Sequence, residues 1–147
     1  MLKKYKIIIA GKNWDFFNQK NIEHITIKGE LEPKQVRKIF NQSKITISSN
    51  CHGLGLHSRI LEAAMEKSLI FMNTSAPNIE GNMANKFIPD IHFVEYNEHN
   101  LNEKLEFWLS NDSAREIITE NMYKLITQKH TWSSRAQEIA NLINEMS

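Results

Sequence analysis

Short apolar runs alternate along the chain with segments in which apolar residues recur at helical spacing. The runs share an enrichment in β-branched residues and lie at 5–10, 25–28, 44–48, 69–72 and 91–95. Such runs predict β-strands. Between the second and third runs, Pro33 can stand in a first helical turn, and Val36 and Phe40 follow at helical spacing. This alternation of strands and helices predicts a parallel sheet with helices packed on it.

The helical pattern recurs through the second half of the chain. Helices are expected to begin at Ser58, near Glu98, at Asp112 and after Thr131. Ser58 and Asp112 are residue types that cap helix N-termini. On the helix from Ser58, Met65 is expected to turn inward together with its apolar neighbours. The C-terminal tail after the last strand is therefore predicted to be purely helical.

Connection lengths suggest the order of the strands. The connection between the first two strands is short, so the second strand is expected beside the first. If the third strand pairs on the other side of the first, the order is 2-1-3-4-5, with a topological switch point between strands one and three. We therefore predict an α/β, Rossmann-like three-layer domain with a five-stranded parallel sheet in this order and a helical C-terminal tail. Residues 1–147 are expected to form this single domain.

Composition narrows the class of protein. The chain has 147 residues, of which 41% are hydrophobic, enough for one core. Lys and Arg total 18 against 17 Asp and Glu, so no charge excess favours sequence-independent binding of nucleic acid. The N-terminal apolar run is too short for a signal peptide or a membrane span, and a cytoplasmic location is expected. Cys51 is the only cysteine, which excludes an intrachain disulfide and a four-cysteine zinc site.

The loops after strands one and three would meet at the switch point. The first loop is Gly11-Lys12-Asn13-Trp14, and the second is the polar, glycine-bearing stretch from Asn50 to Ser58. Open α/β folds bind ligands at this edge, and the helix start behind the second loop offers free N–H groups to an anion. A phosphate-bearing ligand is therefore predicted here. Gly53 and Gly55 could instead serve only a tight turn.

Arg59 and Glu62 stand three residues apart at the start of the helix behind that loop, so their side chains can share a face. The planar guanidinium of Arg59 suits a diphosphate, and the carboxylate of Glu62 can accept hydrogen bonds from a ribose diol. The alternative is a solvent-facing ion pair that stabilises the helix by a few tenths of a kcal/mol.

Other polar and aromatic residues of the two loops could complete the site. His52 and His57 could donate to a phosphate or shuttle a proton, or only make the loop polar. Two histidines without a further ligand do not make a metal site, so no metal is expected. Lys12 could contact a phosphate, while Trp14 could form a flat wall for a nucleobase or a lid over the helix–sheet seam. Cys51 could pair with a histidine as a nucleophile, but a small core residue is the commoner use.

Several motifs occur in an order that resembles a known family. They are Gly11-Lys12-Asn13-Trp14, Ile27-Lys28-Gly29, Ile39-Phe40-Asn41-Gln42-Ser43-Lys44-Ile45, Arg59-Ile60-Leu61-Glu62-Ala63-Ala64, and His130-Thr131-Trp132 with Arg135. In this order the chain resembles the carboxy-terminal, nucleotide-sugar-binding half of GT-B glycosyltransferases. It is most similar to the group-1-like family that includes the CgeB spore-maturation proteins.

The resemblance implies roles for particular residues. Glu62 is expected to hold the donor ribose, and the loop and helix start before it to face the diphosphate. Arg59 matches the arginine before that glutamate, and Gly11 matches the glycine after the first strand. The implied activity is metal-independent transfer of a sugar from a nucleotide-diphosphate sugar, which is the donor substrate, with no separate cofactor.

The chain also departs from this family. Better-known relatives carry an earlier glutamate where Leu54 stands, and relatives place a small-residue pair where this chain has Glu66-Lys67-Ser68. The amino-terminal Rossmann-like half of a GT-B enzyme is missing, and GT-B catalysis takes place between the two halves. The chain alone is therefore expected to bind the donor but to show little turnover, with the missing half or a partner chain completing the enzyme.

The sequence bears on two further classes of function. The alternative is a non-catalytic Rossmann-like interaction module that pairs with a separate partner chain. A flavodoxin-like signalling receiver is disfavoured, because receivers need acidic residues at the ends of strands one and three. Ala10-Gly11 and Ser48-Ser49 occupy those places.

Overall fold

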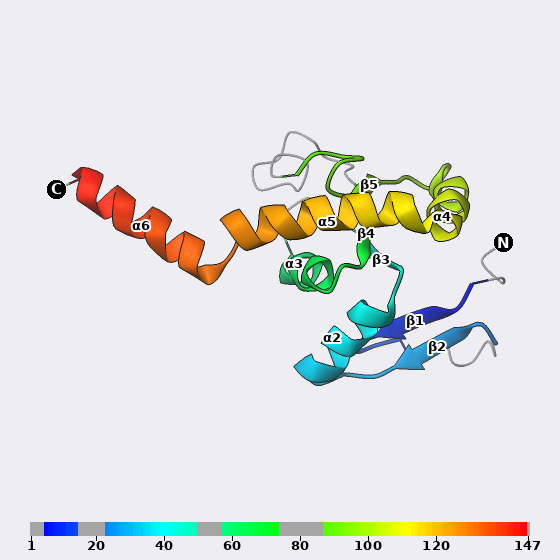
Figure 1. Cartoon of the computed structure of the whole chain (residues 1–147). Coiled ribbons are helices and arrows are strands. Elements are labelled where there is room, and N and C mark those ends of the chain that lie inside the picture. The colour runs from blue at the N-terminus through cyan, green and yellow to red at the C-terminus, as the bar shows by residue number, and fades with distance from the viewer. Residues whose placement is uncertain (1–4, 15–22, 50–56, 74–86, 147) are drawn as a thin grey trace. The chain divides into compact units, whose positions relative to one another are not determined.

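The structure is a computed structural model that describes residues 5–14, 23–49, 57–73 and 87–146. The chain divides into two compact units, Met1–Ile39 and Phe40–Ser147. The described elements follow in the order β1 Ile7–Ala10, β2 Ile25–Lys28, α2 Pro33–Gln42, β3 Ile45–Ser49, α3 Ser58–Met65, β4 Leu69–Asn73, β5 Val94–Glu95, α4 Leu101–Ser110, α5 Asp112–Lys129 and α6 Trp132–Met146 (Figure 1).

All the described strand pairs are parallel. β1 pairs with β2, with Ile7 opposite Ile25. β3 pairs with β4, which pairs in turn with β5. The prediction of an α/β fold with parallel strands and a helical C-terminal tail is therefore confirmed. The prediction of one five-stranded sheet in the order 2-1-3-4-5 is wrong, because the described strands form a two-stranded sheet, β1-β2, and a three-stranded sheet, β3-β4-β5.

The wrong strand order has a physical reason. An apolar run indicates a strand, and a short connection favours pairing with the next strand along the chain, as β1–β2 and β3–β4 do. No comparable feature of the sequence indicates whether β1 pairs with β3, because β2 and α2 lie between them in the chain. Ile8 in β1 and Ile47 in β3 are 44% and 50% exposed. A strand inside a parallel sheet is normally covered on both faces, and among the described strands only β4 shows such burial, from Leu69 to Met72.

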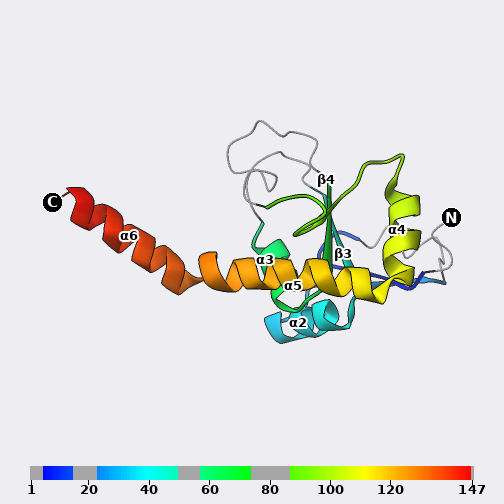
Figure 2. The same ribbon diagram turned by 45° about the horizontal axis from the view of Figure 1, so that its top comes forward.

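The core lies in the second unit. Leu69, Ile70, Phe71 and Met72 of β4 are buried, and α3 and α5 pack beside this strand and against each other (Figures 1 and 2). The main core cluster joins the three elements and the segment before β5 through Ile60, Ala63, Ala64, Ile70, Met72, Phe87, Phe93, Met122 and Ile126. Within the described part of the first unit, no residue is fully buried.

Two predicted helix caps are displaced by one residue. α5 is capped by Asn111, whose side-chain oxygen accepts a hydrogen bond from the Ala114 N–H, and Asp112 is the first helical residue. At α3 the N-cap is His57 and Ser58 lies inside the helix. Met65 was predicted to face inward but is 40% exposed. The predicted helix starts are nevertheless close to those observed.

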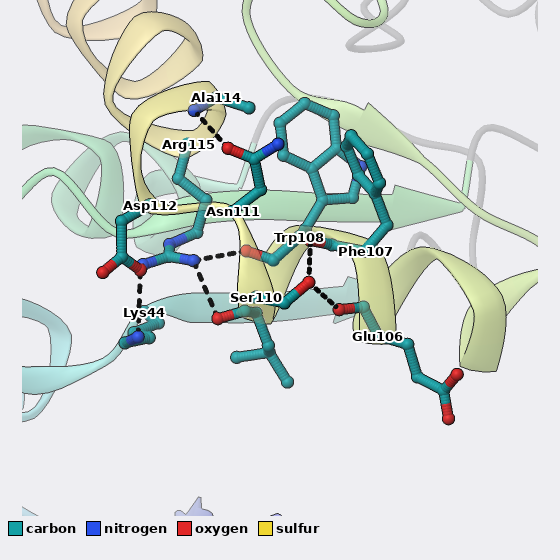
Figure 3. A network of polar contacts seen from close by, with 10 residues as sticks. Lys44, Glu106, Phe107, Trp108, Ser110, Asn111, Asp112, Ala114 and Arg115 are labelled. Atoms are coloured by element: carbon teal, nitrogen blue, oxygen red, sulfur yellow. Dashed lines mark hydrogen bonds and ion pairs between the residues drawn. The ribbon is translucent and has the colours of Figure 1, made fainter.

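A buried cation fixes the junction between α4 and α5. Arg115, 8% exposed, donates to the carbonyl oxygens of Trp108 and Leu109 and to the carboxylate of Asp112. Asp112 also accepts from Lys44, just before β3, at 3.0 Å (Figure 3). The neighbouring carboxylate and carbonyls compensate the cost of burying the guanidinium. These contacts tie the start of α5 to the start of β3.

The C-terminal helix α6 has a different character. Thr131 begins it, as predicted, by accepting a hydrogen bond from the Ser134 N–H. None of the residues from Trp132 to Met146 is buried. Its large apolar side chains are 58% to 92% exposed. They belong to Trp132, Ile139, Leu142, Ile143 and Met146. Helix α6 therefore carries an apolar surface that the described chain does not cover.

Candidate functional site

The turn after β1 holds the first group of predicted site residues. The N–H of Gly11 lies 3.1 Å from the carbonyl oxygens of Lys28 and Gly29, which ties this turn to the end of β2. Gly11 has a φ of 131°, which only glycine adopts without strain. A Cβ at this position would lie 3.5 Å from Nε1 of Trp14, an ordinary contact. Backbone conformation, and not crowding, therefore explains glycine here.

Lys12 and Trp14 project from this turn. The ammonium of Lys12 lies 2.9 Å from the carboxylate of Glu30, and both side chains are largely exposed. Trp14 is 38% exposed, and Asn13 between them has a φ of 66°. The structure therefore places a cation and a partly exposed indole beside one glycine turn at the carboxyl end of β1. An exposed ion pair of this kind contributes little stability, so Lys12 can exchange Glu30 for another anion at little cost.

The start of α3 holds the second group. His57 is the N-cap residue, and its carbonyl accepts from the Ile60 N–H at 3.0 Å. No side-chain hydrogen bond caps α3 in the described structure. His57, Ser58 and Arg59 are all exposed. The N–H groups of Ser58 and Arg59 precede Ile60 in the first turn and have no intrahelical partner, so this end of α3 offers donors to an anion.

Arg59 and Glu62 contact each other on this helix. Nη1 of Arg59 donates to Oε2 of Glu62 at 3.1 Å, and the two side chains are 60% and 42% exposed. The spacing of three residues places them on one face, as predicted. This contact occupies one guanidinium nitrogen and one carboxylate oxygen, and among the described residues the other guanidinium donors and the second carboxylate oxygen have no hydrogen-bond partner.

Part of the predicted site cannot be placed in this way. His52, Gly53 and Gly55, together with Cys51 and Leu54, lie outside the described residues. The turn after β1 and the start of α3 belong to different compact units.

Within the described ranges, no three His, Cys, Asp or Glu side chains are grouped so that they could hold a metal ion. None of the helices described there has the length and apolar character needed to cross a membrane.

A pocket that the sequence analysis missed lies at the carboxyl ends of β4 and β5. It has a volume of about 370 Å³ and is lined by residues 95–98 together with Asn73, Asn100 and Lys104. The sequence feature nearest to this pocket is the pair Asn97 and Asn100, and asparagines at this spacing predict the start of a helix but not a pocket. The pocket requires β5 to pair with β4, which the sequence pattern alone does not reveal.

Comparisons with known proteins agree with the fold. A family model described as glycosyl transferase-like matches residues 1–141. A similar solved structure is the C-terminal domain of the glycosyl transferase group 1 family protein LpcC from Francisella tularensis, with 16% identity, 88% of this chain and 87% of that chain covered, and a TM-score of 0.57. Another is AviGT4, a glycosyltransferase involved in avilamycin A biosynthesis, with 11% identity, 82% of this chain and 37% of that chain covered, and a TM-score of 0.54. No curated protein sequence matches the chain.

The two structural likenesses concern the fold. They confirm the predicted similarity to the C-terminal half of group 1 glycosyltransferases of the GT-B type. The placement near the CgeB proteins stays a prediction. The family model spans nearly the whole chain, and the chain therefore belongs to the glycosyl transferase-like family.

Proposed function

We propose that this chain is the donor-binding domain of a glycosyltransferase and binds a nucleotide-diphosphate sugar. The observation that carries the proposal is the exposed pair of Arg59 and Glu62 on the first two turns of α3. The same helix begins without a side-chain cap in the described structure. A cation, the backbone donors at the helix start and a carboxylate thus lie along a few residues of one helix. The family match supports this assignment.

Each residue would have a distinct task in binding. The second oxygen of the Glu62 carboxylate would accept a hydrogen bond from a ribose hydroxyl, while Arg59 and the N–H groups of the first turn face the diphosphate. His57, as N-cap residue, stands beside those donors. When the sugar leaves, negative charge grows on the diphosphate, and fixed donors stabilise that charge. No metal ion is required for this stabilisation.

The turn after β1 carries its own proposed contacts for a nucleotide. Lys12 would exchange Glu30 for a phosphate oxygen, Trp14 would offer its ring to the nucleobase, and Gly11 would keep the turn open for both. Lys12→Ala should therefore weaken nucleotide binding, and Arg59→Ala should do the same.

Calorimetric titration with UDP and GDP tests the donor site. The wild-type chain should bind at least one of them, and Glu62→Ala should weaken that binding by about tenfold, the effect of losing a hydrogen bond to a charged group. Glu116→Ala is the matched control, because Glu116 is an exposed glutamate on α5 outside the site. Binding that is equal in all three proteins would remove Glu62 from the ribose role.

Sugar transfer would need a second half, from the same protein or from a partner chain. The exposed apolar surface of α6 supports such pairing, because Trp132 is 92% and Met146 88% exposed. Apolar patches that stay uncovered commonly mark sites of protein association.

The same surface supports the alternative function, a non-catalytic interaction module that pairs with a separate chain. The two functions differ in one measurable property. A module would pair through α6 and bind neither UDP nor GDP, whereas a donor-binding domain would bind a nucleotide before any partner is added. Nucleotide binding by the chain alone would therefore decide against the module.

A further inference from the structure

We propose that the pocket at the carboxyl ends of β4 and β5 binds an uncharged sugar unit, at a site separate from the nucleotide. Its volume of about 370 Å³ lies within the range of small-molecule sites, about 300–1,000 Å³. It is located where parallel sheets of open α/β folds receive ligands. The proposal extends the proposed function, yet it requires no bound nucleotide.

The walls of this pocket are already fixed by hydrogen bonds. The N–H of Tyr96 donates to the Met72 carbonyl at 3.0 Å, and its hydroxyl donates to the Ser48 carbonyl at 3.3 Å. The ammonium of Lys104 donates to the Glu95 carbonyl at 2.7 Å. These bonds connect β3, β4, β5 and α4. A ligand would therefore meet ordered walls, which lowers the entropy lost on binding.

Two asparagines of the pocket have their oxygens occupied. Oδ1 of Asn97 accepts from the N–H groups of His99 and Asn100, at 2.9 and 3.1 Å. Oδ1 of Asn100 accepts from the Asn97 N–H at 2.8 Å. Because both oxygens serve backbone donors, the orientation of the two amides is set, and both NH₂ groups remain as hydrogen-bond donors. In the described part of the chain, neither NH₂ group has an acceptor.

The acceptors of the pocket are carboxylates. Glu95 is exposed, and its side chain has no partner among the described residues. Glu98 contacts only the exposed ring of His99, at 3.4 Å, within the same ranges. A carboxylate accepts hydrogen bonds and donates none, so the pocket presents amide donors beside anionic acceptors. Hydroxyl groups, which both donate and accept, match this combination.

Charge selects among ligands that carry hydroxyl groups. The lining holds two carboxylates, Glu95 and Glu98, and one ammonium, Lys104, which already serves a carbonyl. Phosphorylated and acidic sugars would be repelled by the excess negative charge, and such repulsion gives specificity. An uncharged sugar escapes this repulsion, so the pocket suits a neutral glycan better than the diphosphate of a donor.

Amide chemical-shift titration of the full chain tests the site. The probes are glucose, galactose and N-acetylglucosamine, with glucose 6-phosphate and glucuronate as charged counterparts, all without nucleotide. At least one uncharged sugar should produce saturable shifts within residues 95–104, and the charged counterparts should bind more weakly. Glu95→Gln and Asn100→Asp should each weaken binding by at least about fivefold, since they remove a charged acceptor and an amide donor. Asn100→Asp keeps the oxygen that accepts the hydrogen bond from the Asn97 N–H.

Glu103→Gln and Asn102→Asp are the matched controls, because both residues lie on α4 and outside the pocket lining. Both controls should bind like the wild type. The proposal is overturned if no uncharged sugar gives saturable shifts at residues 95–104, if the variants bind as the controls do, or if a charged sugar binds as tightly. Displacement of the sugar by UDP would also overturn it. A chain that binds sugar but no nucleotide would contradict only the proposed donor site.

Discussion

The ammonium of Lys67, in the turn that follows α3, lies 2.6 Å from the carboxylate of Glu120 in α5. It also lies 4.9 Å from the centre of the Tyr123 ring. Lys67 has a φ of 58°, in the left-handed region that favours glycine after a helix. The hydrogen bond with Glu120 raises the pKa of Lys67 and lowers that of Glu120. Contacts with α5 thus accompany a lysine in a backbone conformation that favours glycine.

Substitutions at Lys67 should separate backbone strain from these contacts. Lys67→Ala loses both contacts and keeps the unfavourable φ, so it should lower the melting temperature. Lys67→Gly also loses both contacts but relieves the strain, and it should melt a few degrees above Lys67→Ala. Thermal unfolding followed by circular dichroism measures the difference. Equal melting temperatures would mean that the left-handed conformation costs nothing here.

His92 should make stability depend on pH. Nδ1 of His92 accepts from the Ile88 N–H at 3.0 Å, which requires the neutral ring, and burial lowers the pKa of His92 below its usual 6.5. The unfolded chain then binds the proton first, so stability is complete above pH 6.5 and falls as the pH drops below it. The free energy of unfolding should change with pH by well under ~1.4 kcal/mol per pH unit, the value for one fully coupled proton, since the ring is only partly buried.

Urea unfolding between pH 5 and 7.5 measures this slope. His92→Asn keeps an acceptor for the Ile88 N–H and removes the titration, so its slope should be smaller than that of the wild type. The pKa values of Asp112 and Glu120 are lowered by their cationic partners, so the contribution of these two carboxylates to the free energy of unfolding is lost only at more acid pH. Identical slopes in the two proteins would exclude His92 as the cause.

Arg115 should be among the most sensitive positions for stability. Arg115→Met leaves the carbonyls of Trp108 and Leu109 without their donor and should lower the free energy of unfolding by about 2–4 kcal/mol. Arg115→Lys should recover part of the loss, because an ammonium reaches fewer acceptors than a guanidinium. Urea denaturation measures both. Lys129→Met, on the exposed end of α5, is the control, and a similar loss there would contradict the role of Arg115.

Helices α5 and α6 should respond differently to the same truncation. Ile126 is 3% exposed and Ile139 is 58% exposed. Ile126→Ala should lower the free energy of unfolding by about 2–4 kcal/mol, and Ile139→Ala by less than about 1 kcal/mol, in urea denaturation of the chain alone. A large loss at Ile139 would show that α6 packs against something within the chain or in a second copy of it.

Local signals predicted the elements well. The run at 25–28 became β2 with the same bounds, and Pro33 begins α2 as its fixed φ suggests. β5 is shorter than the run at 91–95. The reason is a tight turn in which Asp90 has a φ of 59° and donates to the Phe93 carbonyl at 2.7 Å. An isoleucine in that turn, Ile91, looks like a strand residue in the sequence.

The site was predictable only where it depends on local spacing. Arg59 and Glu62 share a face because they lie three residues apart on a helix, and the structure brings them together. The order of the strands depends on pairing between segments far apart in the sequence, and that prediction failed. The pocket beside Asn73 and Glu95 was missed for the same reason, because tertiary pairing of β4 with β5 creates it.

The concentration of buried side chains in Phe40–Ser147 has a consequence for the motions of the native chain. The side chains of β4 from Leu69 to Met72 are no more than 1% exposed, whereas β1 and β2 alternate half-buried and exposed positions. In heavy water, amides of β4 should exchange deuterium only through near-global opening, and those of β1 and β2 through much smaller fluctuations. The Lys12 turn would therefore be the more adaptable of the two proposed nucleotide contacts, and the core behind Glu62 the more rigid.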